Sequence, residues 1–211
     1  HGALLGTNNR LVMYAVTSGT TAQSKLIPVT DRFVEDYRRS WQTWGAGCYH
    51  DHVIQQQLFL VQVASSHRRF TTPDGTPCGN ISGLVASMQK FMVRSLYTIP
   101  LEVIQLQDAV AKRDAVVRFA ISDPWVGMLI TANPSTVLQM AEYAEANAES
   151  LIRDIHDGTA SRATLLADQK LLARRLKPRR RRAQELERII SEHGALNLSA
   201  CWPHLNCLGV W

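Results

Sequence analysis

Short apolar segments of strand type alternate along this chain with longer segments of helical periodicity. We expect buried strands over residues 11–16, 58–64, 126–132 and 205–211. Helices are expected over residues 32–44, 84–97, 102–121, 137–155 and 165–176, and from Pro178 to His193. This alternation predicts an α/β fold with a mostly parallel sheet and flanking helices.

The clearest helix pattern follows Asn133-Pro134-Ser135, a typical start signal. Apolar residues then recur at steps of four and three, at Val137, Ala141, Ala144, Ala148, Leu151 and Ile155. Gly158 stands where the helix is expected to stop.

An aromatic row is expected near the start of the chain. Thr30 or Asp31 is a suitable cap for the helix that follows. On that helix one face carries Phe33, Tyr37, Trp41 and Trp44. Packing in the core is the expected role of this row, and a stacking platform is the alternative.

The net charge of +5 comes from one stretch. Residues 170–182 hold eight basic residues and no acidic one, and without them 15 basic residues face 18 acidic ones. Arg179 to Arg182 are expected to form the solvated start of a helix. Contact with nucleic acid or an anionic surface is the alternative, but no aromatic residue is interleaved with the arginines. Nucleic acid is therefore not the expected partner.

Cysteine and histidine placement gives no sign of a metal site. Cys48, Cys78, Cys201 and Cys207 include no C-x-x-C pair, and reduced thiols in the cytoplasm are expected. The spacing Cys48-x-His50-x-His52 suits a strand rather than a tetrahedral site. His67 and His204 are expected to be structural or solvated. The sequence contains no run of about 18 apolar residues, so no membrane span is expected.

The segment from Thr17 to Lys25 follows the first predicted strand and is rich in hydroxyl groups. Gly19 permits close approach of a ligand to the backbone, and turns of this type can bind phosphate through N–H groups. An ordinary polar connection between a strand and a helix is an equal alternative. The segment matches neither the Walker A pattern nor the G-x-G-x-x-G pattern.

Four motifs follow one another along the chain. The first motif combines Thr17-Ser18-Gly19-Thr20-Thr21 with Lys25-Leu26-Ile27-Pro28. The others are Phe70-Thr71-Thr72-Pro73-Asp74-Gly75-Thr76-Pro77, Asn133-Pro134-Ser135-Thr136 and Cys201-Trp202-Pro203-His204-Leu205. In this order they resemble the auxin-responsive acyl acid amido synthetase (Gretchen Hagen) family of the adenylate-forming superfamily, in its bacterial form. Ala22 and Ser24 stand where the family commonly has glycine and proline.

The resemblance implies a ligase that uses ATP and Mg²⁺ to join a carboxylic acid to an amino acid through an acyl-adenylate. It implies phosphate contacts from Ser18, Gly19, Thr20 and Thr21, with Thr17 and Lys25 as weaker candidates. Helices after Thr30 and Pro100 are expected to supply the acyl pocket. Residues 1–211 would be part of an N-terminal domain, inactive alone, with the C-terminal lid domain beyond Trp211.

Overall fold

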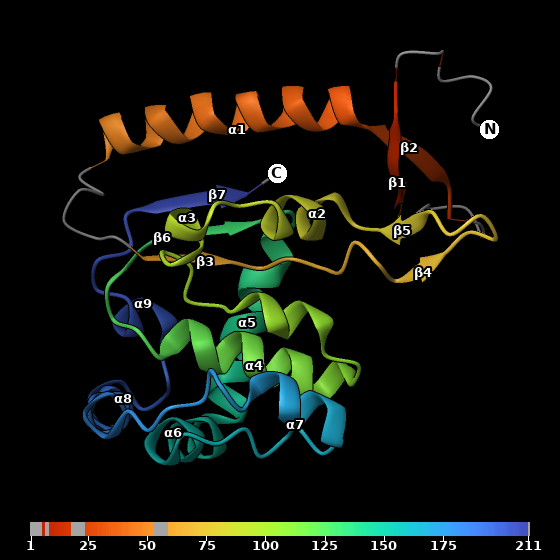
Figure 1. The fold of residues 1–211 in the computed structure, drawn as a ribbon. Helices are drawn as coiled ribbons and strands as arrows, with labels where there is room; N and C mark the ends of the chain where they lie inside the picture. Colours follow the sequence, from red (N-terminus) through yellow and green to blue (C-terminus); the bar gives the residue numbers. More distant parts are fainter. Residues whose placement is uncertain (1–5, 7–8, 18–23, 53–58, 211) are drawn as a thin grey trace. The chain divides into compact units, whose positions relative to one another are not determined.

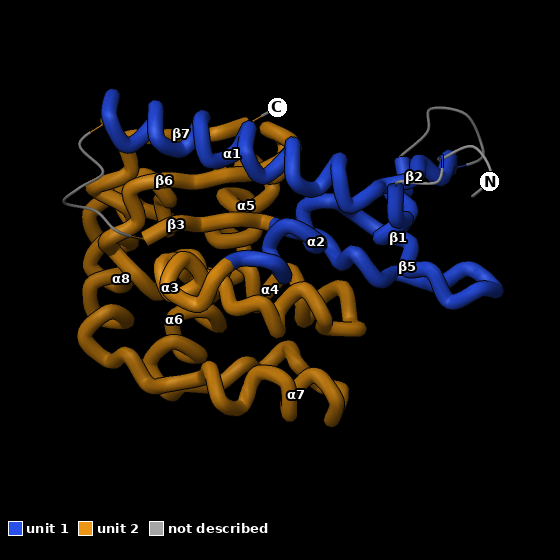
Figure 2. Tube along the Cα trace, turned by 45° about the horizontal axis from the view of Figure 1, so that its top comes forward, with its two compact units in different colours: residues 1–51, 64–89 blue, residues 52–63, 90–211 orange. Residues whose placement is uncertain are grey.

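The computed structural model describes residues 6, 9–17, 24–52 and 59–210. The chain forms two compact units (Figure 2). Unit 1 comprises His1–Asp51 and Ala64–Gln89, and unit 2 comprises His52–Val63 and Lys90–Trp211. Each unit has its own sheet, and we describe the two separately.

Unit 1 is built on a four-stranded mixed sheet in the order β2-β1-β5-β4 (Figure 1). Strand β1 (Leu11–Val16) pairs antiparallel with β2 (Leu26–Thr30) and parallel with β5 (Pro77–Gly79). Strand β4 (Phe70–Thr71) is antiparallel to β5. Two helices, α1 (Asp31–Asp51) and α2 (Ile81–Ser87), complete the unit. Its core consists of Met13, Ala15, Val29, Val34 and Leu84.

The predicted first strand is confirmed, but its partner β2 was missed. Pro28 lies inside β2, opposite Tyr14, and a proline argues against a strand when only the sequence is read. The strand tolerates Pro28 because it lies at the edge of the sheet, where one side needs no hydrogen bonds. The segment from Thr17 to Ser24 therefore connects two antiparallel strands, so the alternative of a strand–helix connection is wrong.

Helix α1 starts where the sequence predicts and continues to Asp51, beyond the expected end at Trp44. Thr30 caps it, since the Phe33 N–H donates to Thr30 Oγ1 at 3.2 Å. The predicted aromatic row exists, with ring centroids 4.9–6.2 Å apart. The prediction that it packs in the core is wrong at both ends, because Phe33 is 43% exposed and Trp44 is 39% exposed.

Unit 2 has a parallel sheet in the order β3-β6-β7. Its strands are β3 (Phe59–Gln62), β6 (Val126–Thr131) and β7 (Cys207–Val210). Figure 1 shows α4 and α5 beside this sheet, with α6, α7 and α8 farther from it. The helical elements are α3 (Phe91–Arg94), the 3₁₀ helix η3 (Leu101–Gln105), α4 (Ala109–Ile121), α5 (Pro134–Ala146), α6 (Ala148–Asp157), α7 (Leu166–Leu172), α8 (Arg180–His193) and α9 (Leu198–Cys201). The predicted α/β class with parallel strands and flanking helices is confirmed.

Three predicted long helices are broken. The segment expected over residues 84–97 is divided between α2 and α3, and the one over 102–121 between η3 and α4. The Asp168 carboxylate, which is fully buried, accepts the Gln107 and Asp108 N–H groups at 3.0 and 3.1 Å and so fixes the break before α4. The strongest stripe divides at Asn147 into α5 and α6, although its residues face the core as predicted. Gly158 ends α6 with φ 72°, as expected.

In unit 2, buried arginines donate hydrogen bonds to carbonyl groups at the C-terminal ends of neighbouring helices. Arg182 donates from Nε to Ile121 O at 2.8 Å and from Nη2 to Cys201 O at 2.7 Å. Arg118 donates in the same way to the Asp154 carbonyl in the last turn of α6 and to the Thr159 carbonyl just after it. Burial lowers the pKa of Arg118 to about 10. A cation at a helix C-terminus is favourable because the carbonyls there carry partial negative charge.

The predicted solvated arginine run is therefore wrong for Arg182, which is 6% exposed. Arg179 also bonds to α4, from Nη1 to Ser122 O at 2.9 Å. Both guanidinium groups approach the negative end of α4. This offsets the unfavourable placement of four cations at the start of α8.

Among the helices that the structure describes, none is long and apolar enough to cross a membrane.

Asp114 is a buried carboxyl group whose replacement is expected to stabilise the protein. It is 1% exposed, and Tyr143 donates its hydroxyl to Oδ1 at 3.1 Å. Burial raises the pKa of Asp114, and the Asp154 charge raises it further, against the lowering effects of Tyr143, Arg162 and Arg118. The folded protein therefore binds this proton more tightly than the unfolded chain does. The contribution of Asp114 to stability falls as the pH rises through its folded pKa.

We expect Asp114→Asn to remove this pH dependence. The free energy of unfolding of the variant is therefore expected to increase relative to that of the wild type as the pH rises. Urea unfolding between about pH 3 and about pH 8 measures the effect. Asp36→Asn, on the exposed surface of α1, serves as the control and is expected to change little. Parallel stability curves for Asp114→Asn and the wild type would contradict the expectation.

Candidate functional site

The predicted phosphate loop connects strands β1 and β2 in sequence. Its two ends are fixed by a pair of contacts across the strands. The Thr17 N–H donates to Lys25 O at 3.1 Å, and the Lys25 N–H donates to Thr17 Oγ1 at 3.3 Å. The remaining predicted site residues, Ser18, Gly19, Thr20 and Thr21, lie outside the described residues.

Thr17 contributes both its backbone N–H and its side chain to these contacts, whereas Lys25 contributes only its backbone. The Thr17 side chain holds the base of the loop through its oxygen. Lys25 contributes its backbone to the same contacts and has an exposed side chain. The Lys25 ammonium is thus placed in solvent at one end of the loop, where it can meet an anion. Sequence reasoning did not predict this cross-strand pairing, because it requires β2.

The parallel pairing of β1 with β5 places a second connection at the same end of the sheet, which we call this edge. Strands β1 and β5 run parallel, with Ala15 opposite Gly79, so both end near this edge. Thr17 follows the first strand, and Asn80 begins helix α2 after the second. Ligands of open α/β sheets bind at the carboxyl ends of parallel strands. This edge is therefore the candidate site in unit 1.

Two glycines let another segment of unit 1 pack against α2. A Cβ added at Gly83 would lie 2.1 Å from Ser65 O, and one at Gly79 would lie 2.5 Å from Ser66 O. The Asn80 N–H donates to Ser66 O at 2.9 Å. Partial burial, together with the Arg68 charge, lowers the pKa of His67 in this segment.

The second family-like motif forms the tight turn between β4 and β5. The Thr72 N–H donates to Thr76 O, and Gly75 occupies the turn with φ 83°. The Thr76 hydroxyl donates to Asp74 Oδ2 at 2.9 Å. Hydrogen bonds from Thr72 and Thr76 lower the pKa of Asp74. This motif shapes the turn, and its polar groups bond mainly to one another.

The other two motifs flank strands of unit 2. Asn133 follows β6 and caps α5, with Oδ1 accepting the Ser135 N–H at 3.0 Å. Trp202 is buried and donates from Nε1 to Ala120 O at 3.0 Å, which anchors the segment before β7 to α4. Asn133 thus lies at the carboxyl end of β6, whereas the role of Trp202 is structural.

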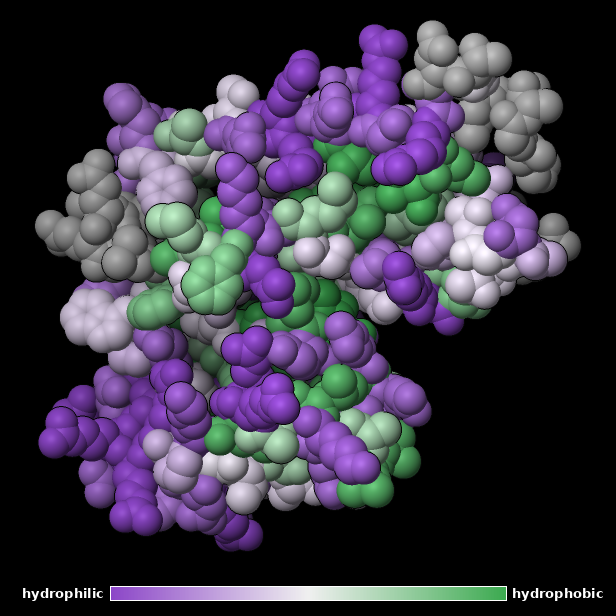
Figure 3. Space-filling model, viewed as in Figure 1, coloured by the Kyte–Doolittle hydropathy of each residue, from purple (hydrophilic) through white to green (hydrophobic). Residues whose placement is uncertain are grey.

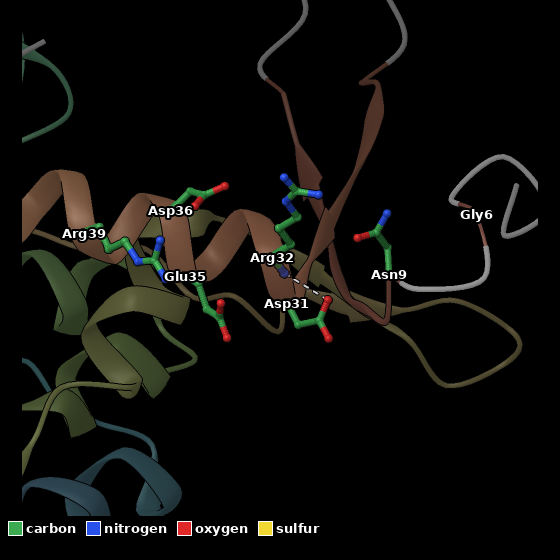
Figure 4. A pocket seen from close by; sticks show the side chains of 7 residues that line it. All are labelled: Gly6, Asn9, Asp31, Arg32, Glu35, Asp36 and Arg39. Carbon is green, nitrogen blue, oxygen red and sulfur yellow. Dashed lines mark hydrogen bonds between the residues drawn. The ribbon is translucent and has the colours of Figure 1, made fainter.

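A cavity of about 740 Å³ lies beside the start of α1 in unit 1. Figure 4 shows its lining residues. Arg32 and Asp36 point to one side of the helix. Asp31 and Glu35 point to the other side. Seven residues line it: Gly6, Asn9, Asp31, Arg32, Glu35, Asp36 and Arg39. Because the charged groups do not converge, we do not assign a ligand to this cavity.

Cys48 and His50 lie within helix α1, so the strand expected from their spacing is wrong. Residues two apart on a helix point in different directions and cannot share a metal ion readily. Within the described part of the chain, no three potential metal ligands lie close enough to hold an ion.

Comparison with known proteins supplies the family. The model of the GH3 family N-terminal domain matches residues 2–211. Among solved structures, "GH3.15 acyl acid amido synthetase" aligns with a TM-score of 0.78 at 16% identity, over 95% of this chain and 36% of that one. "AtGH3.15 acyl acid amido synthetase in complex with 2,4-DB" aligns with a TM-score of 0.71 at 17% identity, with the same coverage.

At such low identity the two structures show a shared fold. This chain spans about a third of their length. No curated protein sequence matches it. The family match covers nearly every residue and includes all four motifs, so the chain belongs to the GH3 family.

Proposed function

We propose that the protein is an ATP-dependent ligase that joins an acyl acid to an amino acid. In the first step a carboxylate oxygen attacks the α-phosphorus of ATP, which forms an acyl-adenylate and releases pyrophosphate. In the second step an amine attacks the acyl carbon, which forms the amide and releases AMP. Membership of the GH3 family and the names of its structural neighbours support this proposal.

The observation that carries the proposal is the pairing of Thr17 with Lys25 at the two ends of the Ser/Thr/Gly segment. This segment connects β1 to β2 in sequence, and Thr17 follows β1 at the end of the sheet where the parallel strands β1 and β5 both end. Adenylation requires donors that bind the polyphosphate and the charge that develops during attack. We propose that Ser18, Gly19, Thr20 and Thr21 supply hydroxyl and backbone N–H donors, with Thr17 and Lys25 in support.

The proposal also covers the cofactor, the substrates and the cellular compartment. Mg²⁺ is expected to accompany ATP, held mainly by phosphate oxygens and water. One structural neighbour is described as a complex with 2,4-DB, which supports a small acid as the first substrate. An amino acid would be the second. None of the four cysteines is in a disulfide, which suits a reducing compartment such as the cytoplasm.

Because the chain spans about a third of its neighbours, the whole protein that contains it is the one to test. We expect that protein to exchange labelled pyrophosphate into ATP when a suitable acid is present. Ser18→Ala combined with Thr20→Ala is expected to lower this exchange about 100-fold, since each lost donor weakens binding of the developing charge.

Ser40→Ala combined with Thr43→Ala is the matched control. Both hydroxyls lie on α1 and bond only to carbonyls of their own helix. Unchanged exchange in the Ser18/Thr20 variant would remove these residues from the site. Failure of exchange across a broad panel of acids would refute the adenylation step.

A further inference from the structure

Five cations from α7 to the first turn of α8 form no ion pair with the residues that the structure describes. Of the eight basic residues over 170–182, Arg175 pairs with Glu102 at 2.8 Å, Arg179 with Asp123 at 3.4 Å, and Arg182 with Glu185 at 2.8 Å. The other five are exposed and form no ion pair with the described part of the chain. We call these five the basic segment: Lys170, Arg174, Lys177, Arg180 and Arg181.

The described acidic groups near the basic segment make other contacts and form no ion pair with it. Asp157 ends α6, which packs against α8, but its Oδ1 is bonded to His156 Nδ1 at 2.7 Å. Asp168 is fully buried and bonds to backbone N–H groups. Figure 3 shows hydrophilic side chains gathered on the surface where α6 and α8 lie.

The arginine run is attached to two loops that carry aromatic rings. Arg179 Nη1 bonds to Ser122 O, and the Asp123 carboxylate that pairs with Arg179 also accepts the Trp125 N–H at 3.0 Å. Arg182 Nη2 bonds to Cys201 O, three residues before His204. These contacts join the loops that carry Trp125 and His204 to Arg179 and Arg182 at the start of α8.

The two rings form a flat stack, in which Trp125 is exposed and His204 is half-buried. The Trp125 and His204 ring centroids lie 4.5 Å apart, and the rings are inclined by only 5°. Trp125 remains 52% exposed. A supported, partly open indole can accept another planar ring by stacking.

We propose that this surface binds single-stranded nucleic acid, with phosphates on the basic segment and a base stacked on Trp125. Cations that follow a backbone beside an aromatic platform are the usual means of single-strand binding. The sequence argued against this partner because no aromatic residue is interleaved with the arginines. The fold supplies the missing aromatic group from the loops after α4 and α9.

An anionic membrane is the competing partner, since Leu165 and Leu166 are exposed at the start of α7. Hydrogen bonds connect the arginine run to the Trp125 and His204 loops, and a flat ring stack fits a base better than an acyl chain. Nucleic acid therefore explains more of the surface.

The test measures fluorescence anisotropy of a labelled oligothymidylate of about 20 nucleotides with the purified protein. Binding is expected at about 50 mM salt and is expected to weaken steeply as salt is added. If all five cations contact phosphates, log K against log salt has a slope of about −3.5, at about −0.7 for each contact. Absence of binding at about 50 mM salt overturns the proposal.

Variants separate the two components of the surface. Arg180→Gln combined with Arg181→Gln is expected to make the slope shallower by about 1.4 and to weaken binding about 50-fold at about 50 mM salt. Lys90→Gln combined with Arg188→Gln removes the same charge from exposed positions of unit 2 outside the basic segment, and a much smaller loss is expected.

Trp125→Ala is expected to weaken binding about tenfold, and Trp125→Phe is expected to recover part of the loss. Trp44→Ala, which removes another partly exposed tryptophan, is the control. Affinity that survives both Trp125→Ala and the Arg180/Arg181 variant overturns the proposal. It is also overturned if Trp125→Ala has no effect while anionic vesicles bind with the same dependence on Arg180 and Arg181.

Discussion

Replacing Arg182 with alanine is expected to lower the free energy of unfolding by about 4 kcal/mol. The side chain is almost fully buried and donates charge-assisted hydrogen bonds to Ile121 O and Cys201 O. Each such bond contributes about 2 kcal/mol, and its loss leaves a buried carbonyl without that donor. The variant is expected to melt roughly 10 °C below the wild type.

The neighbouring residue provides a matched control. Arg181 belongs to the same run but is exposed and bonds to no described acid, so Arg181→Ala is expected to change stability by less than about 0.5 kcal/mol. Arg182→Lys keeps the charge but loses the planar fork and is expected to fall between the two. Equal urea midpoints for Arg182→Ala and Arg181→Ala would show that Arg182 does not join α4, α8 and α9 as described.

Replacing Gly83 with alanine is expected to destabilise unit 1 by about 3 kcal/mol. The added Cβ would lie 2.1 Å from Ser65 O and 2.8 Å from His67 N, and both atoms belong to the backbone. Backbone cannot move aside as the end of a flexible side chain can, so α2 and the Ser65–His67 segment must separate. Overpacking of this kind costs about 1–3 kcal/mol, and the rigid neighbour places Gly83 at the upper end.

Gly47→Ala tests whether the loss comes from crowding rather than from glycine replacement itself. Gly47 lies within α1, four residues before its end at Asp51, and a Cβ there meets nothing within 4 Å. Alanine is a better helix former than glycine, so this variant is expected to gain about 0.5–1 kcal/mol. Chemical denaturation of both variants gives the comparison, and a gain at Gly83 would contradict the packing described for unit 1.

Elements with strong local signals were predictable from the sequence. Strands β1 and β6 and the stops at Gly158 and Gly194 lie where they were expected. In these places a run of apolar residues or one glycine is sufficient to specify the backbone, whatever lies nearby.

The elements that were missed depend on partners far away in the sequence. Strand β2 contains Pro28 and is a strand because β1 pairs with one of its sides. The break before α4 depends on Asp168, about 60 residues later. A periodicity argument considers only neighbours along the chain, so it extends helices across breaks that tertiary hydrogen bonds create.

The candidate site was predicted in part. The motif identified the residues from Thr17 to Lys25 and, by resemblance, the family. It did not show that the loop closes a hairpin or that Thr17 and Lys25 pair across its base. Those features come from the pairing of β1 with β2.

The arginine run shows most clearly what each level determined. The sequence by itself determined the fold class, the family motifs and a stretch of unopposed positive charge. It presented Arg179, Arg180, Arg181 and Arg182 as four equivalent cations. Only the tertiary structure decided that Arg182 is a buried link between helices and Arg180 and Arg181 remain in solvent, because burial depends on which carbonyls the fold brings within reach of each guanidinium.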